Sequence, residues 1–131
     1  MDSSALAKRV VNEPESPRLL TVLRGMVAHG DQLVTSELTV IEISRALRRR
    51  LDAESPRAVV EAIDVALAGL KTMPISGQVT DVARRLGPSS LRSLDAIHLA
   101  TATLIGADVV LAYDDRLLRS AEEVGFATLT P

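Results

Sequence analysis

Apolar residues recur along the chain in two patterns, one typical of amphipathic helices and the other of short buried strands. Stripes at three- and four-residue spacing predict helices over residues 5–11, 16–29, 36–51, 55–70, 77–86, 93–105 and 115–124. Short apolar or β-branched runs predict strands over residues 32–35, 71–75, 108–112 and 126–129. Strands that alternate with helices predict an α/β sandwich with a mainly parallel central sheet.

Small polar residues and glycines mark the ends of these segments. Ser16 stands before a proline, and we expect it, like Ser36 and Ser93, to cap the helix that follows. Gly30 and Gly125 follow the last apolar position of their helices, where glycine suits a C-terminal cap. The boundaries therefore rest on capping chemistry as well as on periodicity.

Length and composition narrow the class of protein. The chain has 131 residues and no cysteine, which predicts one domain over residues 1–131 without disulfides or thiolate chemistry. A net charge of -2 and an aromatic content of 2% argue against a constitutive nucleic-acid coat or a base-stacking platform. Neither a signal peptide nor an apolar run of about 20 residues is present, so we expect a cytoplasmic protein without membrane contact.

Four carboxylates are the main chemical candidates, because each stands at the end of an element or beside an apolar face. Asp114 follows a predicted strand, where ligands of parallel sheets gather, and Asp115 beside it is the alternative helix cap. Asp95 stands in the first turn of a nearly apolar helix, and Glu42 borders an apolar stripe. Asp2 begins the first helical turn. Each has an ordinary interpretation, as a cap, a favourable charge at a helix start or a surface residue.

A cluster of these four acids would need a cation, or else their pKa values would rise. Carboxylate oxygens without His or Cys partners suit Mg²⁺, with Mn²⁺ as a second possibility. His98 comes three residues after Asp95 and can be drawn as a general base, but a partly buried, hydrogen-bonded helix histidine is the better interpretation.

Four segments in order resemble the PIN domain, and most closely the VapC-type toxins of bacterial toxin–antitoxin pairs. They are Asp2-Ser3-Ser4-Ala5-Leu6, Glu42 with Arg45-Ala46-Leu47, Leu94-Asp95-Ala96-Ile97-His98-Leu99-Ala100, and Tyr113-Asp114. The resemblance implies a Mg²⁺-dependent endoribonuclease in which Asp2, Glu42, Asp95 and Asp114 are the catalytic metal ligands, with Ser4 in the same pocket. It also implies an RNA substrate, a homodimer and a cognate antitoxin protein.

Two departures from the family pattern stand out. The family has a short apolar strand before the first aspartate, whereas this sequence begins at Met1-Asp2, so we expect the first strand to be missing and the native protein to have residues upstream. The family also has Thr or Ser two residues before the fourth acid, where this chain has Ala112. The second departure concerns one hydroxyl contact and leaves the four acids intact.

RNA binding requires positive charge near the acids. Arg45 comes one turn after Glu42 and shares its helix face, which makes it a candidate for a phosphate contact. Arg92 and Arg116 flank the third and fourth acids and are further candidates. The run Arg48–Arg50 has an ordinary explanation, since cations favour helix C-termini.

Three other functions compete with this hypothesis. The first is a catalytically silent PIN-like module that binds a protein partner and uses its acids as helix caps. The second is a phospho-accepting receiver domain, which needs a lysine at the carboxyl side of the sheet, whereas the only lysines are Lys8 and Lys71. The third is a two-aspartate phosphatase, which needs an acid where Ser4 stands.

Overall fold

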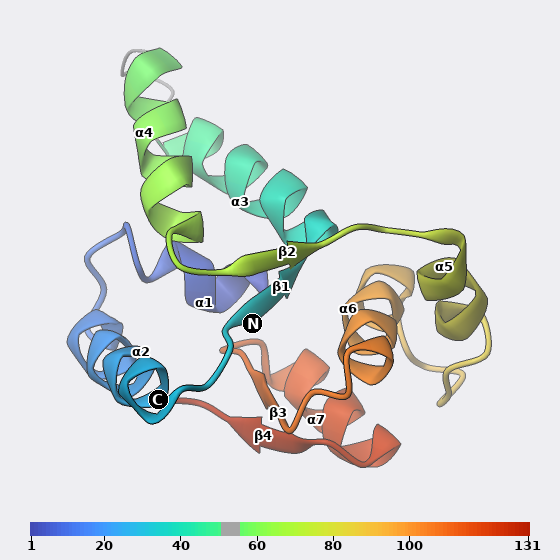
Figure 1. The fold of residues 1–131 in the computed structure, drawn as a ribbon. Helices are drawn as coiled ribbons and strands as arrows, with labels where there is room; N and C mark the ends of the chain where they lie inside the picture. Colours follow the sequence, from blue (N-terminus) through green and yellow to red (C-terminus); the bar gives the residue numbers. More distant parts are fainter. Residues whose placement is uncertain (51–55) are drawn as a thin grey trace.

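The computed structural model describes residues 1–50 and 56–131, which form helices around two pairs of short parallel strands (Figure 1). In chain order the elements are α1 (Ser3–Ala7), α2 (Ser16–His29), β1 (Val34–Ser36), α3 (Glu37–Arg50), α4 (Pro56–Leu67), β2 (Lys71–Met73), α5 (Gly77–Ala83), α6 (Ser93–Leu104), β3 (Val109–Leu111), α7 (Asp115–Val124) and β4 (Ala127–Leu129). Among these described helices, none has the length and apolar character needed to cross a membrane.

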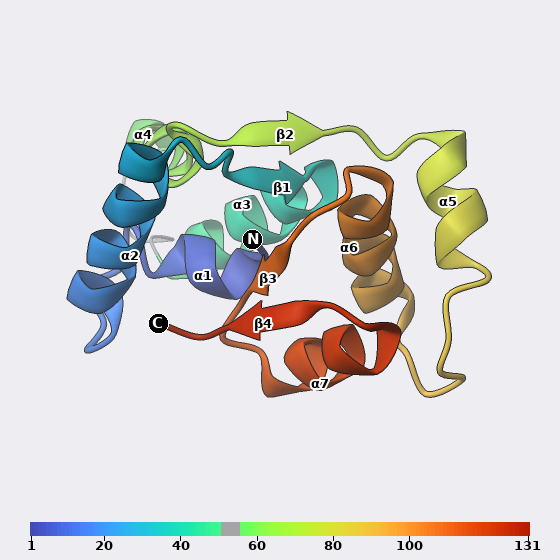
Figure 2. The ribbon, with the colours of Figure 1, turned by 60° about the horizontal axis from the view of Figure 1, so that its bottom comes forward.

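The strands form two separate pairs, which are connected through the first two residues of the chain. β1 pairs in parallel with β2, and β3 pairs in parallel with β4. Figure 2 shows the N-terminus between the two pairs. The Met1 ammonium donates a hydrogen bond to the Val34 carbonyl (2.9 Å), and the Asp2 N–H donates to the Leu111 carbonyl (3.4 Å). The parallel α/β class is confirmed, but the described strands form two pairs joined through Met1 and Asp2 instead of one continuous sheet.

The predicted helix ends are confirmed at several caps. Gly30 and Gly125 close α2 and α7 with φ values of 92° and 100°, in the left-handed region that glycine adopts without strain. Ser36 accepts a hydrogen bond from the Leu38 N–H at the start of α3. The predicted cap roles of Ser16 and Ser93 are wrong, because each is already the first residue of its helix. The predicted cap at Ser55 and helix end at Leu51 lie outside the described residues.

Several predicted segments are longer than the elements that form. The helix predicted over residues 5–11 ends at Ala7, because the next residues are drawn into contacts elsewhere. The Arg9 guanidinium donates to the carbonyls of Ala66 (2.8 Å) and Ala68 (2.7 Å) at the end of α4. The strand predicted over residues 32–35 forms two residues later, and the helix predicted over residues 77–86 ends at Ala83.

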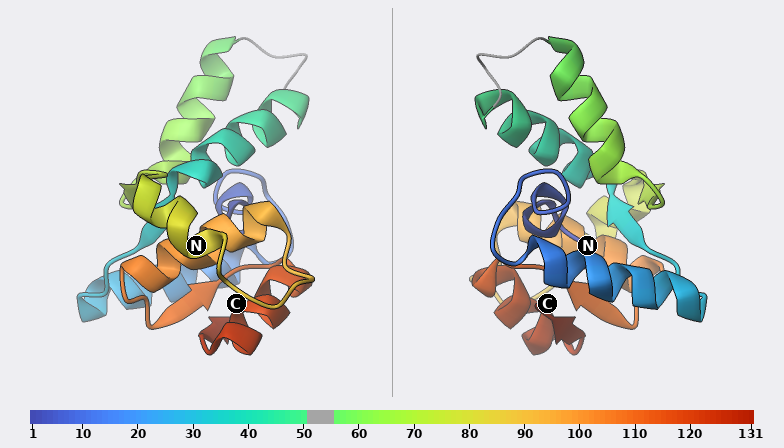
Figure 3. Two further views of the ribbon diagram at one scale, coloured as in Figure 1. Left: turned by 90° about the vertical axis from the view of Figure 1, so that its right-hand side faces the viewer. Right: turned by 90° about the vertical axis from the view of Figure 1, so that its left-hand side faces the viewer.

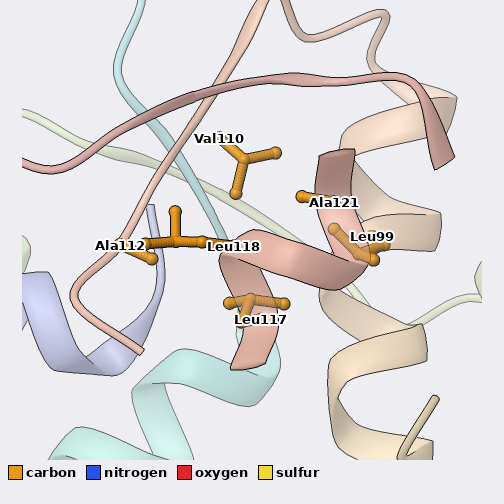
Figure 4. Packing of buried hydrophobic residues seen from close by; sticks show 6 residues of the cluster. All are labelled: Leu99, Val110, Ala112, Leu117, Leu118 and Ala121. Carbon is orange, nitrogen blue, oxygen red and sulfur yellow. The ribbon is translucent and has the colours of Figure 1, made fainter. Parts of the chain in front are cut away.

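Apolar side chains pack in three clusters, which join the helices to one another and to the strands. The first joins α6, β3 and α7 (Figure 4); its buried members are Leu99, Val110, Ala112, Leu117, Leu118 and Ala121. The second ties α1 to α3 and α4; its buried members are Leu6, Ile43, Leu47, Val59 and Ala66. Figure 3 shows α3 and α4 rising together away from the remaining elements. The third cluster joins α1 and α2 to β3 through Ala5, Leu19, Leu23 and Leu111, so α1 packs against elements on both sides of the site.

Candidate functional site

One cavity gathers the four predicted acids. It has a volume of about 210 Å³, and its lining includes Asp2, Glu42, Asp95, Asp114, Ser3, Arg92, Ser93, His98 and Arg116. A larger cavity of about 630 Å³ lies between the two strand pairs and α6, and of the four acids only Asp2 touches it. The smaller cavity is therefore the candidate site.

Asp2 is buried, and its hydrogen-bond donors are neutral groups. Its side chain caps α1, accepting hydrogen bonds from the Ser4 hydroxyl (2.7 Å) and the Ala5 N–H (3.2 Å). The residue is only 6% exposed, and the described part of the chain offers it no ion pair. Burial raises the pKa of the Asp2 carboxyl above its usual range, and the hydrogen bonds from Ser4 and Ala5 oppose that rise only in part.

Ser4 ties the first acid to the far end of β3. Its hydroxyl donates to Asp2 and accepts a hydrogen bond from the Tyr113 N–H (2.8 Å), a residue that follows β3. One hydroxyl thus satisfies a buried carboxylate and a backbone donor that are distant in sequence. The predicted hydrogen bond of Ser4 beside the first aspartate is present, but Ser4 is not among the residues that line the cavity, and its functional role stays a prediction.

Glu42 on α3 faces His98 on α6. The His98 Nε2 and a Glu42 carboxylate oxygen are 3.0 Å apart, and both side chains are largely buried. Burial alone would raise the pKa of Glu42, but hydrogen bonds from His98 and Ser3 together outweigh it, and this pKa lies below its usual range. His98 is thus a partly buried, hydrogen-bonded histidine, as predicted.

Asp95 and Asp114 share one cation. The Arg116 Nε donates to one oxygen of Asp95 (2.9 Å), and the Arg116 Nη2 lies 3.4 Å from the other. The same Nη2 is 3.5 Å from an Asp114 oxygen. Asp114 also caps α7 by accepting the N–H groups of Arg116 and Leu117. The cap and the cavity-lining acid are therefore one residue, and Asp115 is not needed as the cap.

The structure divides the other predicted residues into two groups. Arg92 and Arg116 line the cavity, whereas Arg45 and Asp115 are exposed and are absent from its lining. Sequence reasoning missed Ser3 and the role of His98 as the partner of Glu42. The signal for His98 was available, because its spacing of three residues from Asp95 puts both on one face of α6.

The ligand atoms of this cavity suit a divalent cation, but the distances between its acidic side chains do not yet form a metal site. Four carboxylates and neighbouring hydroxyls are the hard oxygen ligands that Mg²⁺ and Mn²⁺ prefer, and burial raises the pKa of Asp2 despite its hydrogen bonds. Yet across the described residues no three acidic or histidine side chains come close enough together to hold an ion. Each acid is instead turned toward an internal partner: Ser4 for Asp2, His98 for Glu42 and Arg116 for the remaining two.

Comparison with known proteins gives one family. The PIN domain family matches residues 1–123. Ribonuclease VapC47 of Mycobacterium tuberculosis (strain CDC 1551 / Oshkosh) is 38% identical over 133 residues, covering 100% of this chain and 95% of the relative. Ribonuclease VapC46 of strain ATCC 25618 / H37Rv is 41% identical with the same coverage, and Ribonuclease VapC35 is 36% identical over 135 residues. The similarity therefore spans all four elements that carry the acids.

Proposed function

The chain belongs to the PIN-domain family, in its VapC group, and from this premise we propose that it is the endoribonuclease toxin of a toxin–antitoxin pair. We infer that it hydrolyses RNA phosphodiesters with Mg²⁺, or Mn²⁺, held by Asp2, Glu42, Asp95 and Asp114. The relatives whose names contain the word ribonuclease support the activity, since they match the chain along its whole length.

A single observation carries the assignment of the site. Acids separated by as many as 112 positions, from Asp2 to Asp114, line one small cavity, and a cation would lower the cost of burying Asp2. In the silent module, by contrast, caps need only lie at their own helix ends and have no reason to meet.

The residues around the cavity divide the work of hydrolysis. The four carboxylates would hold the cation directly or through waters, while Ser4 and His98 keep Asp2 and Glu42 in place. When bound, the cation would supply an activated water and stabilise charge on the phosphoryl oxygens. Hydrolysis by water does not use the ribose 2′-hydroxyl, so the expected products carry a 5′-phosphate and a 3′-hydroxyl.

Arginines around the acids would hold the RNA backbone. Arg92 and Arg116 line the cavity itself, which supports a contact between either guanidinium and the phosphate under attack. Arg45 is exposed on α3 beyond Glu42, where it would contact a neighbouring phosphate. These contacts are sequence-independent and position the RNA without selecting its bases.

The proposal extends to partners and location on the ground of family alone. We propose a homodimer, a cognate antitoxin protein that blocks the acidic cavity, and a place in the cytoplasm. A segment of the antitoxin inserted across the cavity would cover the acids by the usual modes of peptide recognition.

A catalytically silent PIN-like protein-binding module is the second candidate. It is favoured by the internal partner that each acid already has, and by the lack of a ready metal cluster among the described residues. Under this alternative, Asp2 and Asp114 are helix caps and the other two acids are structural ion pairs.

The deciding experiment is RNA cleavage by the wild type in Mg²⁺ and in EDTA, beside two variants. Asp95→Asn removes an acid of the cavity, and we expect it to lower cleavage by about 10²–10³-fold, the usual cost of losing one preorganised electrostatic group. Asp115→Asn removes an exposed acid outside the cavity and serves as the matched control, with cleavage unchanged. Circular dichroism checks that both variants fold.

Two results would contradict the proposal. Mg²⁺-dependent cleavage that survives in Asp95→Asn removes this acid from the site. A wild type that neither cleaves RNA nor gains thermal stability from Mg²⁺ or Mn²⁺ favours the silent module, because a ligand that binds only the folded state must raise its stability.

A further inference from the structure

Arg116 occupies the part of the cavity between Asp95 and Asp114. It belongs to the first turn of α7, whose start is fixed by the Asp114 cap, so its side chain is directed back over the acids. Its guanidinium engages both oxygens of Asp95 at 2.9 and 3.4 Å and lies 3.5 Å from Asp114. One arginine thus bridges two of the four acids.

The two members of this ion pair differ in their contact with solvent. The side chain of Asp95 is 9% exposed, whereas that of Arg116 is 38% exposed. A buried carboxylate needs a compensating charge, and Arg116 provides it from the solvent side. The guanidinium can therefore leave Asp95 without crossing the protein interior, provided that another cation takes its place.

The Arg116 guanidinium also occupies the side of the Asp95 carboxylate from which it donates its hydrogen bonds. Guanidinium and divalent cations bind carboxylate oxygens through the same lone pairs. Both Asp95 oxygens already accept from Arg116, so a divalent cation that approaches Asp95 meets a positive charge held against the same carboxylate. Two of the four acids, Asp95 and Asp114, thus already have a cationic partner within the cavity.

We propose that Arg116 is the resident counterion of the site: it competes with the divalent cation for Asp95 and Asp114 and, once released, binds the phosphate of the RNA. This inference rests on the proposed function, because it takes the acids as ligands. Released arginine is well suited to the second role, since its planar fork matches phosphate oxygens in a bidentate geometry.

The exchange couples two binding events. While Arg116 is paired with the acids, the free protein binds the divalent cation more weakly than the four carboxylates alone would. An RNA phosphate gives the released guanidinium a new partner and so favours its release. By linkage, RNA and the divalent cation then strengthen each other's binding, and the acids are not fully available until substrate is near.

The test measures binding of Mn²⁺ alone by calorimetry in wild type, Arg116→Gln and Arg92→Gln. We expect Arg116→Gln to bind Mn²⁺ roughly threefold to tenfold more tightly, because no charge-assisted hydrogen bond must be broken first. Arg92→Gln is the matched control: it removes a positive charge from the same cavity, and in the described residues Arg92 makes no ion pair with the four acids. Its Mn²⁺ affinity should stay within about twofold of the wild type.

A second readout follows the guanidinium itself. In the NMR spectrum of the wild type, the Arg116 Nε–H signal, assigned by its loss in Arg116→Lys, should report a hydrogen bond that disappears as Mg²⁺ is added. Neither measurement depends on RNA cleavage. Thermal melting of each variant in EDTA confirms that the protein is folded.

The outcomes separate this inference from the proposed function. Mn²⁺ affinity that is unchanged or weaker in Arg116→Gln overturns the counterion role, and so does equal tightening in Arg92→Gln, which would reflect general charge. A wild type and Arg116→Gln that both fail to bind Mn²⁺ or Mg²⁺ contradict the proposed function and this inference together. Tighter binding in Arg116→Gln alone, with loss of the Nε–H signal in the wild type, supports it.

Discussion

Asp2 and Glu42 line the same cavity, yet their surroundings move their pKa values in opposite directions. Burial raises the pKa of the Asp2 carboxyl, and its hydrogen-bond donors, a hydroxyl and a backbone N–H, are neutral. Burial acts in the same sense on Glu42, but its contacts with His98 and Ser3 lower the pKa below its usual range. The two acids share a cavity but differ in their hydrogen-bond partners.

The difference shows which acid strains the fold. The neutral donors of Asp2 offset only part of its loss of hydration, whereas the contacts of Glu42 with His98 and Ser3 more than offset it. Of these two acids, Asp2 is therefore the one whose ionised form its surroundings disfavour. It is also the one of the two that would gain more from a divalent cation in the cavity.

The largest expected effect, a loss of RNA cleavage, should be the same for both acids. Asp2→Asn and Glu42→Gln should each lower Mg²⁺-dependent RNA cleavage by about 10²-fold or more, since both remove a charged group from the reacting centre. Rates are compared on one RNA at saturating Mg²⁺. If one variant keeps its activity, the two acids differ in function as well as in environment. The acid replaced in the active variant is then not a metal ligand.

The next effect concerns the hydroxyl that positions Asp2. Ser4→Ala should reduce the free energy of unfolding by roughly 1–3 kcal/mol, the cost of leaving the Tyr113 N–H without its acceptor. The Asp2 carboxyl loses a donor in the same step. Urea unfolding in EDTA measures the change.

Ser44→Ala is the control for that substitution. Its hydroxyl donates only to the Val40 carbonyl within α3 (2.6 Å), so the change should stay within about 0.5 kcal/mol. Equal losses in the two variants would mean that Ser4 has no special role in joining the chain start to β3.

The smallest effect is a pair of opposite pH dependences. Because the pKa of Asp2 is raised on folding, the native state loses stability as the pH rises from the usual value of 3.8 through the raised one. Asp2→Asn should therefore have a higher Tm than the wild type at neutral pH in EDTA. The gap should close as the pH falls below 3.8.

Glu42 should show the reverse. Its pKa is lowered on folding, so its contribution to stability is present above the usual value of 4.5 and is lost as the pH falls through the lowered value. Glu42→Gln should lower Tm at neutral pH, with a difference that shrinks in acid. Thermal melts of both variants across this pH range measure the pair, and shifts of the same sign would refute the contrast between the two acids.

Much of this site could be predicted because its acids stand at element ends. Asp114 directly follows a strand and Asp95 begins a helix, so local pattern placed both near the carboxyl side of the strands. Gly30 and Gly125 likewise ended their helices as expected, since the left-handed cap is a local requirement. Features that depend on a few neighbouring residues were predictable.

Features that depend on partners distant in sequence could not be predicted. The pairing of Arg116 with Asp95 spans 21 positions, and that of His98 with Glu42 spans 56. Neither pair has a local pattern that distinguishes it from an ordinary surface charge. The early end of α1 has a similar origin, because Arg9 is held by carbonyls 57 and 59 positions away. The separation of the strands into two pairs also depends on tertiary contacts.

The hydrogen bonds of Met1 and Asp2 have a mechanical consequence. Met1 is hydrogen-bonded to β1 and Asp2 to β3, so these two residues connect the β1–β2 half of the molecule to the β3–β4 half. Sliding of one half against the other would pull first on the backbone that bears the Asp2 carboxylate. The most deeply buried of the four acids thus stands where the two strand pairs are joined, so its position depends on both pairs at once.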